Sequence, residues 1–411
     1  MRTILWLLGG LAIGLSALAG TARQPAPPTL TTAQWQADVE TFLRQLPEKH
    51  ANAFHHLTRA EYDAAAAALR ARVAGSNPDE ILVAMLQIAA RIGDGHTYVH
   101  MPASTHRLPV QLLPFGADLR VVRATEEAKA LLGGRLVKID GVAVAQIVER
   151  VHTVVSQAES DAFVRGIIPS RIRVTEVLHG LGVVADPLHV RLTVADDTGA
   201  ERTVAVTAID ASSKPAWVEA AAAQPLSSQH REEQLWFTWI GQSKTVYVGF
   251  RGYDDLRQQA KQLWSFVDAH PASKIVIDLR DNGGGDYTEG RKHIVEPLRR
   301  RPSLRAYALV GNHTFSAAMN NAVDLRNAHA TLVGEEIGER PNSYQENDEM
   351  TLPNSRLVVS YSTRYYEFLP GFPPEGSPPT VVPDQTIEPT WEEFRTGRDP
   401  VLEWVLAQPM V

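Results

Sequence analysis

The sequence of 411 residues contains no cysteine. Disulfide bonds, thiolate metal sites and a cysteine nucleophile are therefore excluded together. Common metal and phosphate motifs are missing too, since neither His-Glu-x-x-His nor a strand followed by a P-loop pattern occurs. We accordingly expect no metal site and no organic cofactor.

An excess of positive charge is also absent. Lysine and arginine number 40 against 47 aspartates and glutamates, which gives a formal net charge of −7, and the basic residues form a run only at 299–301. A protein without a basic face has little to attract the phosphates of a nucleic acid. We therefore expect no nucleic-acid partner.

Long hydrophobic runs are scarce, and the one at the N-terminus is short. Residues 4–18 form an apolar run that follows Met1-Arg2 and precedes small residues up to Ala22. This arrangement is typical of a secretory signal peptide, and the run is shorter than the ~20 residues that a membrane-spanning helix needs. We expect a signal peptide at 1–22 and a mature protein in the periplasm or outside the cell, without a membrane span.

The length predicts two or three domains, and a content of 44% hydrophobic and 21% charged residues is ordinary for a globular protein. Helical spacing dominates the first part, short strands with a helical insert at 145–182 follow, and the last part alternates strand and helix patterns. The predicted divisions are the signal peptide at 1–22, a helical domain at 23–106, a β-rich module at 107–211 and an α/β core at 212–411.

Two stretches of the core, 274–285 and 306–319, share one pattern. Each begins with an apolar, β-branched run, which ends at turn residues and is followed by a helical pattern. Each indicates a strand that feeds a helix at its carboxyl end. Reacting groups in open α/β sheets gather beyond these strand ends. The glycines at 283–285 allow backbone N–H groups to approach a ligand closely, and Ser316 is predicted at the first turn of the next helix.

Ser316 is the first candidate nucleophile. The plain alternative is an N-cap serine, which stabilises a helix by ~1 kcal/mol. Catalysis needs a base to take the hydroxyl proton and donors for the oxyanion. The glycine turn at 283–285 and the backbone N–H of Ala317 are candidates for those donors.

His96 is the leading candidate base. It lies in the sequence Gly-Asp-Gly-His-Thr at 93–97, where a helical pattern gives way to a strand pattern. The alternatives are that His96 is an ordinary loop histidine, or that His313, three residues before Ser316, is the base. Because such a turn is costly to keep at a helix end, we prefer His96.

At these residues the chain resembles the C-terminal-processing, or tail-specific, serine peptidases and their tricorn-like relatives. The matching segments run in the family's order along most of the mature chain: 93–97, 276–284, 314–318, 333–335, 383–384 and 397–400. The resemblance implies an α/β fold with a crotonase-like ββα core, a PDZ-like module before it and a helical N-terminal domain.

The resemblance also implies roles for the site residues. It marks Ser316 as nucleophile and the backbone amides of Gly284 and Ala317 as the oxyanion hole. Many members use a downstream lysine as base, but the corresponding segment 338–344 contains no lysine. The tricorn-like branch uses an upstream histidine instead, and His96 matches it. That branch also has a downstream glutamate that orients the site, for which Glu375 is closest by spacing and Glu367 is the alternative.

The implied activity is that of an exported serine endopeptidase that hydrolyses polypeptides through an acyl-enzyme. Two departures from the family pattern are the helical insert at 145–182 and Met319, where many members have glutamate. The alternative functions are a non-catalytic protein on the same fold that binds a hydrophobic ligand or a peptide, and an acyl hydrolase that acts on small esters.

Overall fold

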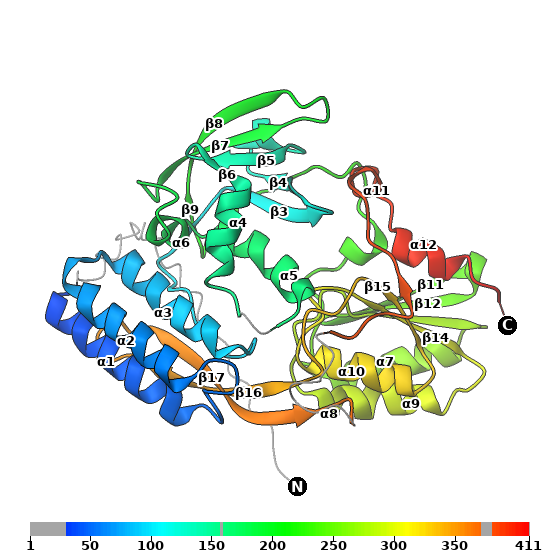
Figure 1. Cartoon of the computed structure of the whole chain (residues 1–411). Coiled ribbons are helices and arrows are strands. Elements are labelled where there is room, and N and C mark those ends of the chain that lie inside the picture. The colour runs from blue at the N-terminus through cyan, green and yellow to red at the C-terminus, as the bar shows by residue number, and fades with distance from the viewer. Residues whose placement is uncertain (1–29, 157–158, 371–379, 411) are drawn as a thin grey trace, which may run out of the picture.

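The computed structural model describes residues 30–156, 159–370 and 380–410 (Figure 1). The expected signal peptide and Glu375 therefore lie outside the described residues. Within these ranges, no helix combines the length and the apolar character needed to cross a membrane.

Three helices open the described chain, and they confirm the helical pattern of this region: α1 (Thr32–Lys49), α2 (Arg59–Arg72) and α3 (Pro78–Ile92). Each begins with a capping box at Thr31, Thr58 or Asn77. The side chain of this residue accepts a hydrogen bond from the backbone N–H three residues later, and the side chain of that later residue accepts one from the backbone N–H of the capping residue. Helix α3 is the most buried of them and ends at Gly93, whose φ of 102° only glycine adopts easily. This left-handed turn redirects the chain toward the site.

The next region is built around a sheet with the order β10-β4-β5-β7-β8, flanked by β3 and β6. Its strands are β3 (Val110–Phe115), β4 (Asp118–Ala124), β5 (Arg135–Ile139), β6 (Val142–Ala143), β7 (His189–Ala195), β8 (Glu201–Thr207) and β10 (Val218–Glu219). A short ladder joins β2 (His106–Arg107) to β9 (Ile209–Asp210). Helix α4 (Val144–His152) follows β6.

The helical insert expected at 145–182 contains α4 and two further helices, α5 (Asp161–Ile172) and α6 (Thr175–Gly180). The break has a physical cause at the residues between them. Arg173 O accepts a hydrogen bond from Leu108 N (2.8 Å), and Val174 forms a β-bridge with Arg107. These contacts to a strand segment replace the helical hydrogen bonds at this point.

The core holds a sheet with the order β11-β12-β13-β14-β15-β18, in which all neighbours except β11 and β12 are parallel. Its strands are β11 (Leu235–Ile240), β12 (Thr245–Phe250), β13 (Lys274–Asp278), β14 (Arg305–Val310), β15 (Thr331–Gly334) and β18 (Gln385–Thr386). Strands β12 and β13 are buried along their whole length. This explains why they read as continuous apolar runs.

Helices cover both faces of this sheet (Figure 1). One face packs against α7 (Leu256–Asp268), α9 (Glu296–Arg299) and α10 (Ala317–Asn327), with α8 (Tyr287–Gly290) and a π-helical turn (Arg291–Val295) leading into α9. The other face packs against α12 (Pro400–Leu406), which follows α11 (Trp391–Arg395). The core thus has the layered α/β arrangement that the sequence predicts.

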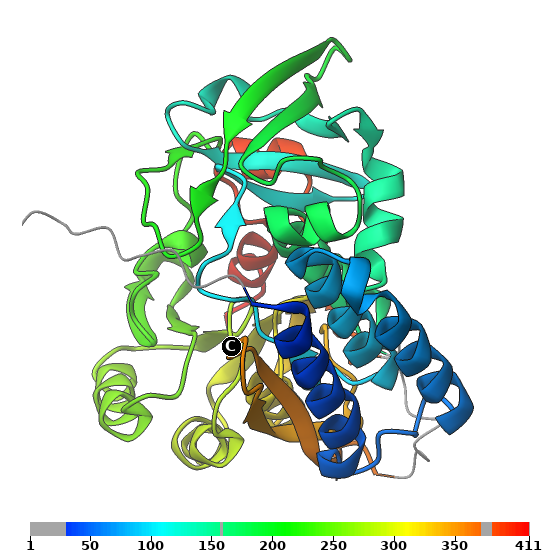
Figure 2. The same ribbon diagram turned by 90° about the vertical axis from the view of Figure 1, so that its left-hand side faces the viewer.

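A long hairpin links the core to the N-terminal helices. Strands β16 (Asn342–Thr351) and β17 (Val358–Glu367) pair antiparallel, and β17 also pairs with β1 (Tyr98–Val99). Figure 2 shows this orange hairpin running beside the blue helix α1. The backbone N–H groups of Asn354 and Ser355 at its turn donate to the buried carboxylate of Asp38 on α1. The sequence pattern predicts a hairpin with strands at 349–352 and 357–361 only. The observed strands extend well beyond these bounds, into polar residues that carry no clear strand pattern.

Lys274 provides a first test of how the C-terminus is held. Its fully buried side chain donates from Nζ to the carbonyls of Val405 (3.2 Å), Leu406 (2.9 Å) and Gln408 (2.8 Å), where α12 ends. Because Lys274→Met removes the Nζ donor from these carbonyls, although Val405 O still accepts from Gln408 N (3.1 Å), we expect a loss of about 2–4 kcal/mol in unfolding free energy, measured by urea denaturation. The exposed Lys261→Met should change it by less than ~0.5 kcal/mol. Equal midpoints for the two variants would contradict this account.

Candidate active site

Ser316 lies in the sharp turn between β14 and α10. Its backbone has φ 53° and ψ −125°, a combination that non-glycine residues adopt rarely and at a cost of about 1–3 kcal/mol. Although Ser316 occupies the N-cap position of α10, its side chain makes no capping hydrogen bond. The structure therefore does not support the plain helix-cap alternative, and the hydroxyl is left available for another partner. A serine on such a strand-to-helix turn matches the geometry of a nucleophile elbow.

Hydrogen bonds from neighbouring strand ends hold this turn. Thr314 Oγ1 donates to Leu279 O (2.9 Å) and accepts from Gly311 N (3.0 Å). Phe315 N donates to Asn282 O (3.1 Å), and the buried Asn282 side chain donates to Phe250 O (3.0 Å). The turn that carries Ser316 is thus fixed to the ends of β12 and β13.

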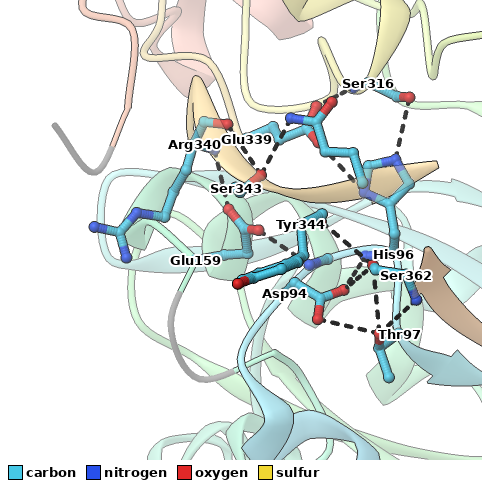
Figure 3. A network of polar contacts seen from close by, with 12 residues as sticks. Asp94, His96, Thr97, Glu159, Ser316, Glu339, Arg340, Ser343, Tyr344 and Ser362 are labelled. Carbon is cyan, nitrogen blue, oxygen red and sulfur yellow. Dashed lines mark hydrogen bonds and ion pairs between the residues drawn. The ribbon is translucent and has the colours of Figure 1, made fainter. Parts of the chain in front are cut away.

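His96 comes to Ser316 from the other side, on the turn that follows α3. Its Nε2 lies 3.1 Å from Ser316 Oγ (Figure 3). Its ring stacks on Phe315, with centroids 4.9 Å apart. Only 6% of His96 is exposed. The competing histidine, His313, lies within 3.0 Å of Gly166 O through its own Nε2. The structure therefore brings Ser316 together with His96 and engages His313 elsewhere.

Glu339 is the carboxyl group that faces the far side of the His96 ring. Its Oε1 lies 3.4 Å from His96 Nδ1, both atoms are buried, and its Oε2 accepts a hydrogen bond from Ser316 N (Figure 3). One carboxyl group thus touches both members of the pair.

Sequence reasoning missed Glu339. The segment 338–344 was considered only because it lacks the lysine that many family members have there. The position of Glu339 in that same segment is the signal by which it could have been found. Glu367, the described alternative, is exposed on β17 opposite Asn342. The structure therefore places Glu339, and not Glu367, at the His96 ring.

Two further carboxylates support the His96 loop. Glu159 accepts from Gly95 N and Arg340 N, both at 3.0 Å. Asp94 accepts from Thr97 Oγ1 (3.1 Å) and from His96 N (3.2 Å), and the hydroxyl of Ser362 on β17 also donates to it. Figure 3 shows these acidic groups gathered around His96. They fix the loop to the hairpin and to the segment that carries Glu339.

Burial governs the protonation of these groups. Burial lowers the pKa of His96 to about 4, although the nearby Asp94 opposes this change. Burial raises the pKa of Glu339 well above its usual range, with Glu159 adding to the effect. Burial likewise raises the pKa of Glu159 to about 7, against the backbone N–H groups of Arg340 and Gly95. His96 is therefore neutral at neutral pH, the form that can accept a proton.

Asp94 behaves in the opposite way. Burial alone would raise its pKa, but hydrogen bonds from His50, His55 and Ser362 outweigh burial and hold the pKa of this carboxyl below its usual range. Asp94 therefore stays ionised, and its charge is balanced by donors rather than by an arginine or lysine.

The cluster of His50, His55 and Asp94 has a composition that suits a metal ion. The hydrogen bonds, however, assign another role. Asn52 N donates to His50 Nδ1 (2.9 Å), so the proton of this ring is on Nε2, which lies 2.8 Å from Asp94 Oδ2. A metal on Nε2 would need a His50 ring without a proton on either nitrogen, whereas metal-bound histidines normally donate from the second nitrogen. The cluster therefore fits a hydrogen-bonded support for Asp94 better than a metal site.

The predicted oxyanion donors lie against Ser316 but differ in availability. A Cβ added to Gly284 would lie 2.6 Å from Ser316 Cβ, so only glycine fits there, with φ 109°. The Gly284 N–H donates to Asn282 Oδ1 (3.0 Å) and already has an acceptor. Ala317 is the first residue of α10, where backbone N–H groups have no acceptor within the helix. Binding of an oxyanion by Gly284 stays a prediction that requires this hydrogen bond to be shared or exchanged.

No protein-family model matches the chain, and no curated protein matches it. Among solved structures, mature CPAF aligns with a TM-score of 0.63 over 92% of this chain and 99% of CPAF, at 11% identity. Mature CPAF complexed with lactacystin aligns with a TM-score of 0.61 over 91% and 98%, also at 11% identity. The photosystem II D1 C-terminal processing protease aligns with a TM-score of only 0.43 at 14% identity, over 89% of this chain and 98% of its own. The likeness to CPAF shows that this chain shares its mixed α/β fold along nearly the whole length.

Proposed function

We propose that this protein is a serine peptidase in which Ser316 is the nucleophile and His96 is the base. The observation that carries the proposal is the 3.1 Å approach of His96 Nε2 to a Ser316 hydroxyl that does not cap its helix. The shared fold adds support, because mature CPAF, whose fold this chain resembles, is a serine protease. Polypeptides are the substrate class that follows from this proposal.

In the proposed reaction, Ser316 Oγ attacks a peptide carbonyl while His96 Nε2 takes its proton. Backbone N–H groups of Ala317 and Gly284 hold the oxyanion that forms. His96 then gives the proton to the leaving amine, which departs and leaves an acyl group on Ser316. Water attacks this ester as His96 accepts a proton again, and His96 returns that proton to Ser316 Oγ as the acid product leaves. Glu339 orients Nδ1 and offsets the positive charge that His96 carries in between.

The finer parts of the proposal concern domains and compartment. We assign 212–411 to a crotonase-like core, 107–211 to a PDZ-like module and 23–106 to the helical domain. The histidine base supports the tricorn-like branch over members that use a lysine. The N-terminal pattern at 1–22 supports export to the periplasm or the medium. These assignments follow from the sequence resemblance together with the arrangement of the described elements.

A fluorophosphonate probe, which reacts with activated serines, tests the proposal. We expect the wild-type protein to gain one adduct, which peptide mass spectrometry locates on Ser316. The Ser316→Ala and His96→Ala variants should gain none under the same conditions. An unlabelled wild-type protein, or an adduct on another serine, would be evidence against the proposed site.

The pH dependence of cleavage gives a second test. The reaction needs neutral His96, and burial lowers the pKa of His96 to about 4. In Glu339→Gln, which removes the carboxyl whose pKa burial raises, the remaining activity should therefore persist as the pH falls through 6, where an ordinary histidine becomes charged, and should be half lost near pH 4. The wild-type protein should lose activity at a higher pH, because Glu339 must be ionised to offset the charge on His96. The measurement is kcat/KM against pH for a peptide without ionisable side chains. An acid limb near pH 6.5 in Glu339→Gln would show that His96 is not held in this environment.

A further inference from the structure

A cavity of about 310 Å³ lies beside the proposed catalytic pair. Its lining includes Gly95 and Thr97, which flank His96, as well as Phe315 and Gly283, which precede Ser316 and Gly284 in the chain. The cavity therefore lies next to both residues of the pair, on the side where a substrate residue beside the reacting carbonyl would be placed. Cavities of this size commonly hold the recognised part of a small ligand or side chain.

Two helices supply the facing walls. Phe163, Ile167 and Arg171 on α5 are spaced at four-residue intervals, so they share one face of that helix. Leu86 and Ala90 on α3 show the same spacing. The walls are thus largely apolar, and Arg171 introduces a positive charge at one end of the α5 face.

Among the described residues, no acidic side chain pairs with Arg171 to balance this charge. Its Nε is buried without a hydrogen-bond partner, and no ion pair to it occurs among the described residues. The hydroxyl of Ser156, which also lines the cavity, is likewise buried, and no described residue hydrogen-bonds it. The described lining contains one acid, Asp94, which is engaged by His50, Thr97 and Ser362. An unpaired cation in an apolar cavity leaves a large part of its desolvation cost uncompensated.

We infer that Arg171 and the cavity recognise a carboxylate carried on an apolar segment of the substrate next to the cleaved bond. A guanidinium binds a carboxylate through paired, charge-assisted hydrogen bonds, and Ser156 adds a hydroxyl donor. The carboxylate has two sources, an acidic side chain or the free carboxyl terminus of the peptide. This inference rests on the proposed peptidase function, because the cavity can be a substrate subsite only if the neighbouring Ser316 and His96 cleave peptides.

Peptide binding to the Ser316→Ala protein tests the inference without turnover. One pair of fluorescent peptides has a single Glu or Gln within an apolar, C-terminally amidated sequence. A second pair ends in Leu as the free acid or as the amide. Anisotropy should show that the acid of one pair binds about 10- to 100-fold more tightly than its neutral partner, as expected for a charge-assisted hydrogen bond. The responding pair identifies the source of the carboxylate.

Arg171→Met, made in the same background, should bring that ratio close to one, and Arg171→Lys should restore part of it. Arg173→Met is the matched control, since Arg173 also has a buried, unpartnered Nε but packs near Trp217 outside the cavity lining. It should keep the wild-type ratio. Equal binding of acid and neutral peptides, no binding of either pair, or a ratio that survives Arg171→Met would overturn the inference. Probe labelling of Ser316 in the wild-type protein reports separately on the proposed function.

Discussion

Replacing Ser316 by alanine is expected to lower kcat/KM for peptide cleavage by about 10³–10⁶, and His96→Ala should cost a similar factor. Both changes remove the same proton transfer, because His96 Nε2 is the partner of Ser316 Oγ at 3.1 Å. The double variant should therefore be no slower than the slower single variant. Non-additivity of this kind distinguishes a functional pair from two residues that each affect folding.

The measurement is the initial rate of cleavage of an internally quenched peptide by proteins purified in parallel. His189→Ala is the control, since His189 is exposed on β7 and its ring pairs with Asp186. It should keep the wild-type rate. Cleavage by Ser316→Ala at more than a tenth of the wild-type rate, or a double variant whose losses multiply, would refute a shared role.

Glu339→Gln is the second change with a large expected effect. The amide keeps the volume of the side chain, and its oxygen can still accept from Ser316 N. It cannot become negative when His96 takes up a proton, so the imidazolium loses its counter-charge. We expect kcat to fall by about 10²–10⁴ while KM changes little, because the interaction strengthens only in the transition state.

Separate kcat and KM values decide this prediction, and Glu367→Gln is the matched control. Glu367 is the alternative that the family spacing suggested, but it is exposed on β17. We expect Glu367→Gln to behave like the wild type. A large loss of kcat in Glu367→Gln, or normal turnover by Glu339→Gln, would remove Glu339 from the account.

The sequence was most informative where local pattern and burial agree. Strand β13 is buried on both faces, so its continuous apolar run was recognisable, and capping boxes at Thr58 and Asn77 mark helix starts directly. The turn with Ser316 was found from its strand-to-helix pattern. Its closeness to His96, 220 residues away, required the family resemblance or the structure.

Other features leave little local signal. Glu339 lies between glycine and arginine, a context that usually indicates an exposed charge, and its complete burial arises only from the packing of distant segments. Strand β16 was predicted only at its end, because 342–348 contains mainly polar residues whose partners are also polar. The break between α5 and α6 depends on a strand more than sixty residues earlier. Each miss reflects tertiary contacts that override local preference.

The most direct test of the central claim is to trap the acyl group on Ser316. The purified protein is mixed rapidly with an activated peptide ester, quenched in acid and analysed by intact-protein mass spectrometry and peptide mapping. We predict a transient species that is heavier by the acyl group, and peptide mapping should place this group on Ser316. The species should be absent in Ser316→Ala and should form far more slowly in His96→Ala. Turnover of the ester without any adduct on Ser316, or with the acyl group on another residue, would contradict the claim.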